Sequence, residues 1–271
     1  VGAAIGTNVE DLERAKALID NGIDLIVIDT AHGHSKKVLK ILSKVKKNNK
    51  TPICVGNIAT AEAAKRLFNS GADVIKVGIG PGSICTTRMV AGIGVPQISA
   101  IMEVYNALKG KKIKIISDGG IKFSGDIAKA IAAGADAIMM GSIFAGTEES
   151  PGKKFKIKGK VYKQYRGMGS IGAMSAGSAN RYFQKNFKDK SKYVPEGVEG
   201  RVEYKGKVSK IIYQLQGGLR SSMGYIGAKN LENIPSKAKF LKITKAGFYE
   251  SMVHSVEMIN DGSNYKLWKL I

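Results

Sequence analysis

A cysteine beside a glycine-rich turn is the residue of this chain best suited to covalent chemistry. Cys85 follows the run Gly78–Ser83 and precedes Thr86 and Thr87, so its thiol stands among glycines and hydroxyl groups. A thiolate in such a loop is a nucleophile when its pKa is lowered, and glycines let a ligand approach the backbone. Cys54 instead lies inside an apolar stretch, where a buried thiol is inert. We therefore expect covalent chemistry at Cys85 and not at Cys54.

Two further glycine turns could bind an anion. The sequences Asp118-Gly119-Gly120 and Gly141-Ser142 each follow a short apolar run. Backbone amides without side-chain obstruction bind phosphate, and in barrel enzymes the loops after the last two strands commonly form that site. The carboxylate of Asp118 could accept hydrogen bonds from a ribose. These turns predict a site for a phosphorylated ligand.

These residues follow short apolar segments that alternate with amphipathic ones, a pattern typical of parallel strands joined by helices. Gly22, Gly71 and Gly134 each come just after a predicted helix, where glycine supplies the left-handed terminal residue. The pattern Thr7–Glu10 predicts a capping box for the first helix. The predicted strands are 2–6, 24–29, 52–57, 73–78, 113–118 and 136–141, and the predicted helices are 9–20, 35–47, 61–70, 97–109 and 125–133.

The distribution of polar residues decides between two parallel folds. A doubly wound sheet concentrates functional residues at one crevice, whereas a TIM barrel carries them after every strand. Here glycine and polar residues follow the strands at 29–34, 56–57, 78–83, 118–120 and 141–142. The sequence therefore predicts the α/β class and a (β/α)8 TIM barrel, with six of its eight strands visible.

After residue 149 the βα pattern ends. Residues 150–215 are rich in Lys and Gly and show no clean period, and a connection of that length is usually functional. We predict a mobile flap that contains a short β-ribbon near 155–164. A helix at about 217–229 and a polar tail follow, so the catalytic domain 1–271 divides into βα units (1–149), flap region (150–215) and C-terminal segment (216–271).

The composition limits the partners. Lys and Arg number 43 against 22 Asp and Glu, a net charge of +21, which favours anionic ligands. The lysines are scattered, however, and a nucleic-acid surface usually clusters Arg with aromatic residues. We expect no specific nucleic acid, no membrane span and a cytoplasmic protein. The three histidines stand in no metal-binding motif, so we expect no zinc site.

Several segments together resemble the inosine 5′-monophosphate dehydrogenase family, in order over essentially the whole chain. The resemblance implies oxidation of IMP to XMP by NAD+, the committed step toward guanine nucleotides. It also implies that the chain begins at the third strand of the barrel, so we expect an incomplete barrel. The matching motifs are Gly80-x-Gly82-Ser83-Ile84-Cys85-Thr86-Thr87-Arg88, Asp118-Gly119-Gly120-Ile121, Met139-Met140-Gly141-Ser142, Tyr165-Arg166-Gly167-Met168-Gly169-Ser170 and Ser178-Ala179-Asn180-Arg181-Tyr182.

The same resemblance implies a role for each matching residue. Cys85 would attack purine C2, hydride would pass to NAD+, and water would hydrolyse the covalent intermediate. Arg181 and Tyr182 in the flap would activate that water, with Thr87 orienting it. The remaining matches are Ser83, Gly120, Gly141, Ser142 and Tyr165 for the phosphate, Asp118 for the ribose, Gly167, Met168, Gly169 and Glu196 for the purine, and Asp29, Thr30 and Gly78 for the dinucleotide.

The resemblance also implies a bound K+ ion and a homotetramer. The carbonyl groups of Gly80, Gly82 and Cys85 match the donors to the cation, and a neighbouring subunit would complete the site near Glu250, Ser251 and Met252. Two other functions stay open from the sequence. A GMP reductase shares the barrel and the Cys loop but uses NADPH, and the flap pair argues against it. A basic nucleic-acid-binding module is the second.

Overall fold

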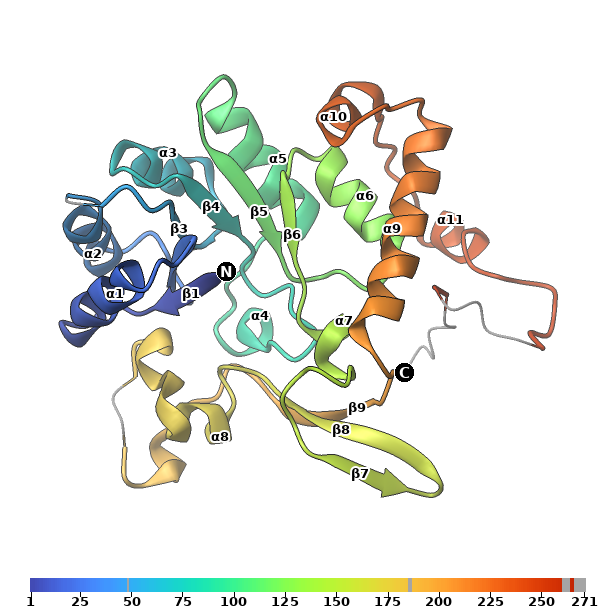
Figure 1. The fold of residues 1–271 in the computed structure, drawn as a ribbon. Coiled ribbons are helices and arrows are strands. Elements are labelled where there is room, and N and C mark those ends of the chain that lie inside the picture. Colours follow the sequence, from blue (N-terminus) through green and yellow to red (C-terminus); the bar gives the residue numbers. More distant parts are fainter. Residues whose placement is uncertain (48, 185–186, 260–263, 266–271) are drawn as a thin grey trace.

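A six-stranded parallel sheet forms the body of the computed structural model, which describes residues 1–47, 49–184, 187–259 and 264–265. Neighbouring strands follow one another in sequence order, β1-β2-β3-β4-β5-β6, and every pairing is parallel (Figure 1). This order has no reversal, so the chain forms part of a barrel and not a doubly wound sheet. The strands are β1 (Gly2–Ile5), β2 (Leu25–Asp29), β3 (Ile53–Ile58), β4 (Val74–Val77), β5 (Lys114–Asp118) and β6 (Ala137–Met139).

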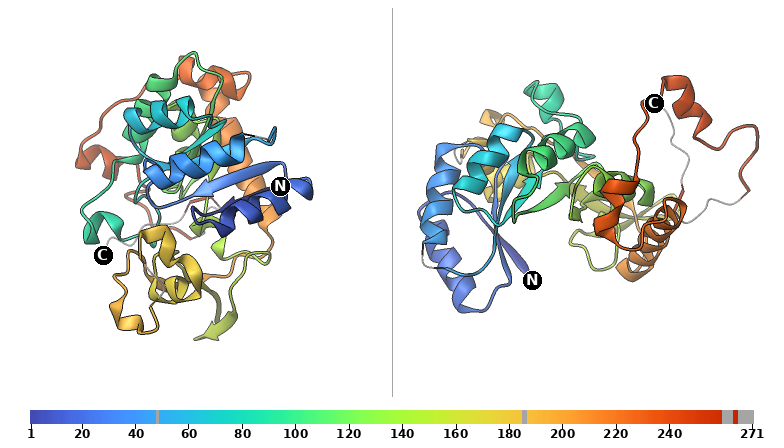
Figure 2. Two further views of the ribbon diagram at one scale, coloured as in Figure 1. Left: turned by 90° about the vertical axis from the view of Figure 1, so that its left-hand side faces the viewer. Right: turned by 90° about the horizontal axis from the view of Figure 1, so that it is seen from above.

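Helices cover the outer side of this sheet (Figures 1 and 2). They are α1 (Glu10–Asp20), α2 (Lys36–Lys46), α3 (Ala61–Asn69), α5 (Gln97–Leu108) and α6 (Ser124–Ala132), each within one residue of its predicted bounds. Gly22, Gly71 and Gly134 have positive φ, of 74°, 96° and 112°, which confirms their predicted role after the helices. The predicted capping box is wrong. The amides of Gly6 and Asn8 donate to the carboxylate of Asp11, and no side chain caps α1 at Val9.

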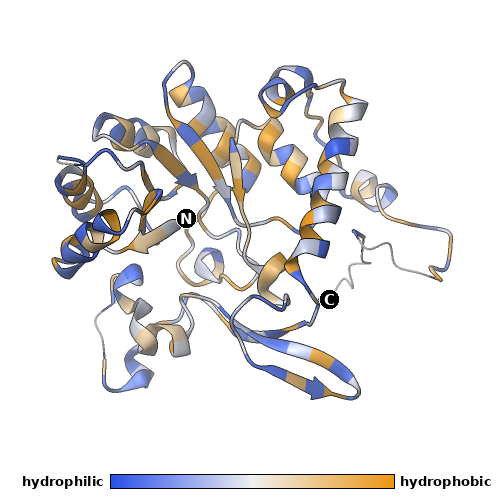
Figure 3. Ribbon diagram, viewed as in Figure 1, coloured by the Kyte–Doolittle hydropathy of each residue, from blue (hydrophilic) through white to orange (hydrophobic). Residues whose placement is uncertain are grey.

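The strands of the sheet are mostly apolar, as Figure 3 shows by their orange colour. The central strands β2, β3 and β4 are largely buried, whereas the edge strands β1 and β6 are partly exposed. All six residues of β3 are buried, and alternate side chains point to opposite faces of the sheet. Ile53 and Val55 join the core beneath the helices, whereas Cys54 lies on the inner face. Burial raises the pKa of Cys54 to about 12, as expected for an inert thiol.

The segment after β6 is more ordered than the sequence predicts. Strands β7 (Lys154–Ile157) and β8 (Lys160–Arg166) form the predicted ribbon, and β9 (Glu199–Glu203) adds a third, antiparallel strand. Between β8 and β9 lie the helical turns α8 (Ile171–Ala173), η1 (Met174–Ser178), η2 (Ala179–Tyr182) and η3 (Lys190–Lys192). The part of the flap region that carries these turns, residues 167–198, therefore has its two ends joined by the β8–β9 ladder.

The C-terminal helix α9 (Val208–Tyr225) begins nine residues before the predicted start at 217. Gly217 and Gly218, the predicted first residues of the helix, lie inside it. A Cβ on Gly218 would stand 2.0 Å from Ser124 Oγ, so glycine is needed where α9 packs on α6. The remaining elements are α4 (Thr87–Val90), α7 (Ser142–Ala145), η4 (Leu231–Asn233), α10 (Ile234–Lys237) and α11 (Lys245–Glu250). No helix in the described ranges is long and apolar enough to cross a membrane.

Candidate active site

The carboxyl ends of the strands and the flap enclose a cavity of about 390 Å³. Loops after β4 and β5 form one wall, and residues from β8, η2 and the segment before β9 form the other. Fourteen of the residues predicted from the sequence line it: Thr30, Gly78, Gly80, Gly82, Cys85, Thr87, Asp118, Tyr165, Gly167, Met168, Gly169, Arg181, Tyr182 and Glu196. Residues more than 150 positions apart in the chain thus meet in one place.

The loop that carries Cys85 is held by backbone contacts with residues 196–198. The amide of Thr86 donates to the carbonyl of Glu196 at 2.9 Å, and the amide of Val198 donates to the carbonyl of Ile84 at 3.0 Å. Cβ atoms on Gly167 and Gly197 would lie 3.2 and 3.3 Å from that Ile84 oxygen. Glycine at both positions therefore permits the close approach that fixes the cysteine loop.

The thiol of Cys85 begins a short chain of hydrogen bonds. Its Sγ lies 3.2 Å from Thr87 Oγ1, and that hydroxyl donates to Glu196 Oε2 at 2.7 Å. A thiol, a hydroxyl and a carboxylate in this order provide a path by which the thiol proton can leave. Glu196, assigned from the resemblance to purine binding, therefore also reaches the catalytic side of the cavity.

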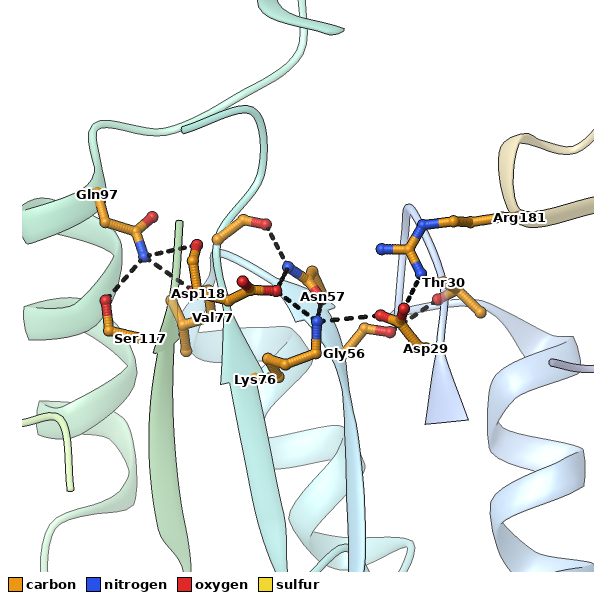
Figure 4. A network of polar contacts seen from close by, with 11 residues as sticks. Asp29, Thr30, Gly56, Asn57, Lys76, Val77, Gln97, Ser117, Asp118 and Arg181 are labelled. Atoms are coloured by element: carbon orange, nitrogen blue, oxygen red, sulfur yellow. Dashed lines mark hydrogen bonds and ion pairs between the residues drawn. The ribbon is translucent and has the colours of Figure 1, made fainter. Parts of the chain in front are cut away.

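Behind the cavity lies a buried cation that the sequence analysis missed. Lys76, on β4, is 2% exposed, and its Nζ lies 3.0 Å from Asp29 Oδ1 and 2.5 Å from Asp118 Oδ2 (Figure 4). The same ammonium donates to Asn57 Oδ1, and Asn57 Nδ2 donates to Asp118 Oδ2 at 2.9 Å. The available signal was a single lysine within the apolar run 74–77.

This network fixes the backbone as well as the carboxylates. Asn57 Nδ2 also donates to the carbonyl of Gly78 at 2.8 Å, and Gln97 Nε2 donates to Val77 O and Ser117 Oγ beside Asp118 (Figure 4). A Cβ on Gly78 would lie 2.2 Å from the carbonyl of Asp118. Gly78 is therefore required by packing, whatever it contributes to a cofactor.

The flap residue Arg181 reaches across the cavity to the end of β2. Its guanidinium forms an ion pair with Asp29 (Figure 4). The Ala31 amide also donates to the Arg181 carbonyl, at 3.3 Å. Burial opposes the charge of both partners, but the charged and hydrogen-bonding neighbours of each together outweigh it. The pKa of Asp29 is lowered by Lys76 and Arg181, and the pKa of Arg181 is raised by Asp29.

The neighbouring Tyr182 packs on the backbone of the purine segment. A Cβ on Gly169 would lie 2.9 Å from Tyr182 Cζ, so only glycine leaves room for the ring. Burial raises the pKa of Tyr182 despite the opposing charge of Arg181. The hydroxyl of Thr30 donates its hydrogen to Gly56 O at 2.9 Å, so toward a ligand it can only accept a hydrogen bond.

Four of the predicted phosphate residues, Ser83, Gly141, Ser142 and Tyr165, meet at the start of α7. The fifth, Gly120, lies beside Pro81 in the cysteine loop. Ser83 Oγ donates to Ser142 Oγ at 3.0 Å, which joins the cysteine loop to this helix. A Cβ on Gly141 would lie 3.2 Å from Tyr165 Oη, so that phenol stands directly over the turn. Gly120 has a φ of 80°, a conformation that glycine adopts freely.

Three predicted residues lie elsewhere in this chain. Glu250 and Ser251 are exposed and Met252 is half-buried, all at or just after α11. That helix lies beyond α9, well apart from α4 and the cysteine loop (Figure 1). A contribution to the cation site therefore requires a second copy of the chain.

Comparison with known proteins accounts for this arrangement. The family model described as "IMP dehydrogenase / GMP reductase domain" matches residues 1–254. The chain belongs to the IMP dehydrogenase and GMP reductase family. It is 56% identical over 267 residues to the inosine-5′-monophosphate dehydrogenase of Aquifex aeolicus, covering 98% of this chain and 54% of that protein. It is 54% identical over 265 residues to that of Cryptosporidium parvum, covering 98% and 66%.

A solved structure of this family has the same fold. The crystal structure of GMP reductase C318A from Trypanosoma brucei, in complex with guanosine 5′-monophosphate, superposes with a TM-score of 0.87 at 45% identity. The match covers 95% of this chain and 52% of that one. The chain thus spans about half to two thirds of the length of these relatives. The prediction of a partial TIM barrel is confirmed.

Proposed function

We propose that this chain carries the active site for oxidation of IMP to XMP with NAD+, in guanine nucleotide synthesis. The observation that supports it best is the contact of Cys85 Sγ with Thr87 Oγ1, which in turn contacts Glu196, inside one cavity with Asp118. A thiol that can pass its proton to a neighbouring hydroxyl and carboxylate, next to the Asp118 carboxylate that can bind a ribose, suits attack on a purine nucleotide. The curated relatives cited above bear the corresponding name.

IMP would bind with its ends in different subsites. Asp118 would accept the ribose hydroxyls, held in place by Lys76 and Asn57. The purine would lie against Met168, Gly169 and Glu196 in the same cavity. The phosphate would bind where the turns and the phenol meet, on Ser83, Gly120, Gly141, Ser142 and Tyr165.

In the first step Cys85 forms a bond to purine C2. The thiol proton moves toward Thr87, whose own hydrogen bonds to Glu196, so a thiolate can form without bulk water. The hydride displaced from C2 leaves to NAD+, which supplies only the acceptor for that electron pair. The purine remains attached through sulfur.

The residues around Asp29 fit the ribose of a dinucleotide. Asp29 Oδ1 is buried and forms an ion pair with Lys76, whose Nζ lies 3.0 Å away. A ribose hydroxyl could donate to that oxygen. Thr30 and Gly78 line the same side of the cavity. Asp29, Thr30 and Gly78 would therefore hold NAD+.

The flap and the dinucleotide would use the same carboxylate in turn. Arg181 pairs with Asp29 in this structure, so NADH must leave before the flap reaches this position. The docked flap brings Arg181 and Tyr182 to the cavity that holds Cys85. Hydrolysis would follow, with water adding to C2 and the sulfur leaving as thiolate.

The ion pair limits what Arg181 can do in that step. Because Asp29 raises its pKa, the guanidinium stays protonated and cannot accept a proton while paired. In this position it would orient the water and stabilise developing negative charge. The hydroxyl of Thr87 and the carboxylate of Glu196, 2.7 Å apart, are the groups that could take the proton.

The cation site and the assembly follow from the same proposal. Carbonyl oxygens suit K+, and the amide of Cys85 donates to the carbonyl of Gly82 in the tight turn that would present them. Gly80, Gly82 and Cys85 supply donors from one subunit. Glu250, Ser251 and Met252 of a neighbour would supply the rest in a homotetramer. The division into βα units, flap and C-terminal segment belongs to this proposal, and residues 260–263 and 266–271 of that last segment lie outside the described residues.

A GMP reductase activity is the second candidate, because the solved structure above is a GMP reductase bound to GMP. One spectrophotometric comparison separates the two. IMP with NAD+ and K+ should produce NADH, whereas GMP with NADPH should leave the absorbance constant. NADPH consumption with release of ammonia, and no NADH formation from IMP, would reverse the assignment.

A further inference from the structure

A lysine of β8 is buried without a place in the chemistry above. Lys163 is 2% exposed, and its ammonium donates to backbone oxygens of the segment 147–150. The Thr147 carbonyl lies 2.7 Å from Nζ and the Ser150 hydroxyl lies 3.1 Å away, and the Ser150 carbonyl is a further acceptor. Burying a charge is costly unless hydrogen bonds replace its hydration, and an ammonium has three donors to satisfy. The hydrogen bonds of Lys163 supply those partners, and they tie strand β8 to the segment 147–150.

The segment held by Lys163 closes the end of α7. Ser150 Oγ donates to the Ala145 carbonyl at 2.7 Å, and Thr147 Oγ1 donates to the Phe144 carbonyl at 2.8 Å. These two carbonyls belong to the last residues of α7, and Phe144 O also accepts from the backbone amide of Thr147 at 2.9 Å. The ammonium also places a positive charge at the negative end of this short helix. Lys163 therefore fixes α7 from its trailing end.

The leading end of the same helix carries part of the proposed phosphate site. α7 begins at Ser142, whose hydroxyl accepts a hydrogen bond from Ser83, and Gly141 precedes it. Tyr165 is two residues after Lys163 in β8, and residues at this spacing project from the same face of a strand. Lys163 and Tyr165 thus both reach toward α7, one at each end, and α7 and β8 are in contact.

We infer that Lys163 is a positioning residue for the 5′-phosphate subsite. It fixes the distance between the Gly141–Ser142 turn and the Tyr165 phenol, so that amides, hydroxyls and phenol converge on one anion. This inference rests on the proposed function, because it takes those residues as the phosphate contacts. Lys163 should therefore affect only the part of the nucleotide affinity that depends on the phosphate group.

The test compares IMP with inosine, which differs only by lacking the phosphate. Dissociation constants for both are measured by calorimetry on the wild-type chain, on Lys163→Met, and on the control Lys160→Met. Lys160 is exposed on the same strand, so the control removes the same charge from the surface of the ribbon. Lys163→Met should weaken IMP binding about tenfold and leave inosine binding unchanged. The control should change neither.

Each outcome decides one question. Equal weakening of IMP and inosine by Lys163→Met, or no change in either, would overturn the positioning role. A wild-type chain that binds inosine as tightly as IMP would instead overturn the phosphate subsite and with it the proposed function. If Lys163→Met does not fold, Ser150→Ala removes one acceptor and the cap on Ala145 while leaving the lysine. It should weaken IMP selectively, and unchanged IMP binding would contradict the inference.

Discussion

Replacing Lys76 by methionine should destabilise the protein in a pH-dependent way. The ammonium lies between Asp29 and Asp118, whose side chains are only 25% and 21% exposed. Methionine keeps most of the side-chain volume but leaves two nearby carboxylates without this cation. Removing one partner of a buried ion pair costs about 3–5 kcal/mol, and the partial exposure of both carboxylates favours the lower end, about 3 kcal/mol.

The sign of the pH dependence follows from Asp29. Burial raises its pKa, and Lys76 and Arg181 together outweigh that effect, so its pKa is lowered in the native protein. The stabilisation from this carboxylate is present above its unfolded pKa and is lost only as the pH falls through the lowered native value. Without Lys76 the pKa of Asp29 rises, so Asp29 becomes protonated at a higher pH. Its protonation removes the repulsion between the carboxylates of Asp29 and Asp118. The loss of stability should therefore be largest near pH 7 and smaller near pH 5.

Urea unfolding at both pH values measures this effect. At pH 7 the midpoint should fall by about 1 M with the slope unchanged, and the difference from wild type should shrink at pH 5. Lys44→Met on α2, an exposed position, serves as the control for removal of a charge. A loss below about 1 kcal/mol at pH 7, or one that grows in acid, would refute the assignment of Lys76 as the cation that holds the two carboxylates.

Four further outcomes are expected. Cys85→Ala should abolish NADH formation while IMP still binds, and a tenth of wild-type turnover would exclude Cys85 as the nucleophile. IMP with NAD+ should trap a mass adduct on the peptide containing Cys85, and Cys54, with its pKa raised to about 12, should show none and resist iodoacetamide in the native state. Arg181→Ala should give a burst of about one NADH per site followed by slow turnover, whereas equal slowing of both phases would place Arg181 in the first step. Deleting residues from Glu250 onward should weaken activation by K+, and an unchanged K+ dependence would remove that segment from the cation site.

The βα units could be predicted because local pattern and burial agree there. Strands β2, β3 and β4 are mostly apolar runs that are largely buried in the sheet, and the glycines at 22, 71 and 134 mark the helix ends by their own conformation. The start of α9 could not be predicted in this way. Gly218 suggests a helix boundary locally, but its role is to admit Ser124 of a helix distant in sequence.

Part of the site was predictable from motifs, and part depends on three-dimensional contacts. Cys85, Thr87 and Arg181, which the motifs identified, line one cavity in the structure. Their chemical roles stay predictions. Lys76 and Lys163 escaped notice because a lysine in a strand is usually an exposed residue. Their acceptors come from other strands or loops, which no local pattern reveals. Strand β9 was missed for the same reason, since β8 is its partner.

The pairing of β8 with β9 also determines how freely the flap can change in length. Arg166 and Glu199 are partners in that ladder, so the intervening chain is a loop whose two ends are tied together. For a flexible loop the entropy of closure grows only with the logarithm of length, and doubling the length costs about 0.6 kcal/mol. Insertions into the outer part of the loop, away from Arg181, should therefore scarcely change how often its guanidinium meets Asp29. The identity of the residues in the loop, far more than the length of the loop, therefore sets the balance between the state in which Arg181 contacts Asp29 and the state in which it is released.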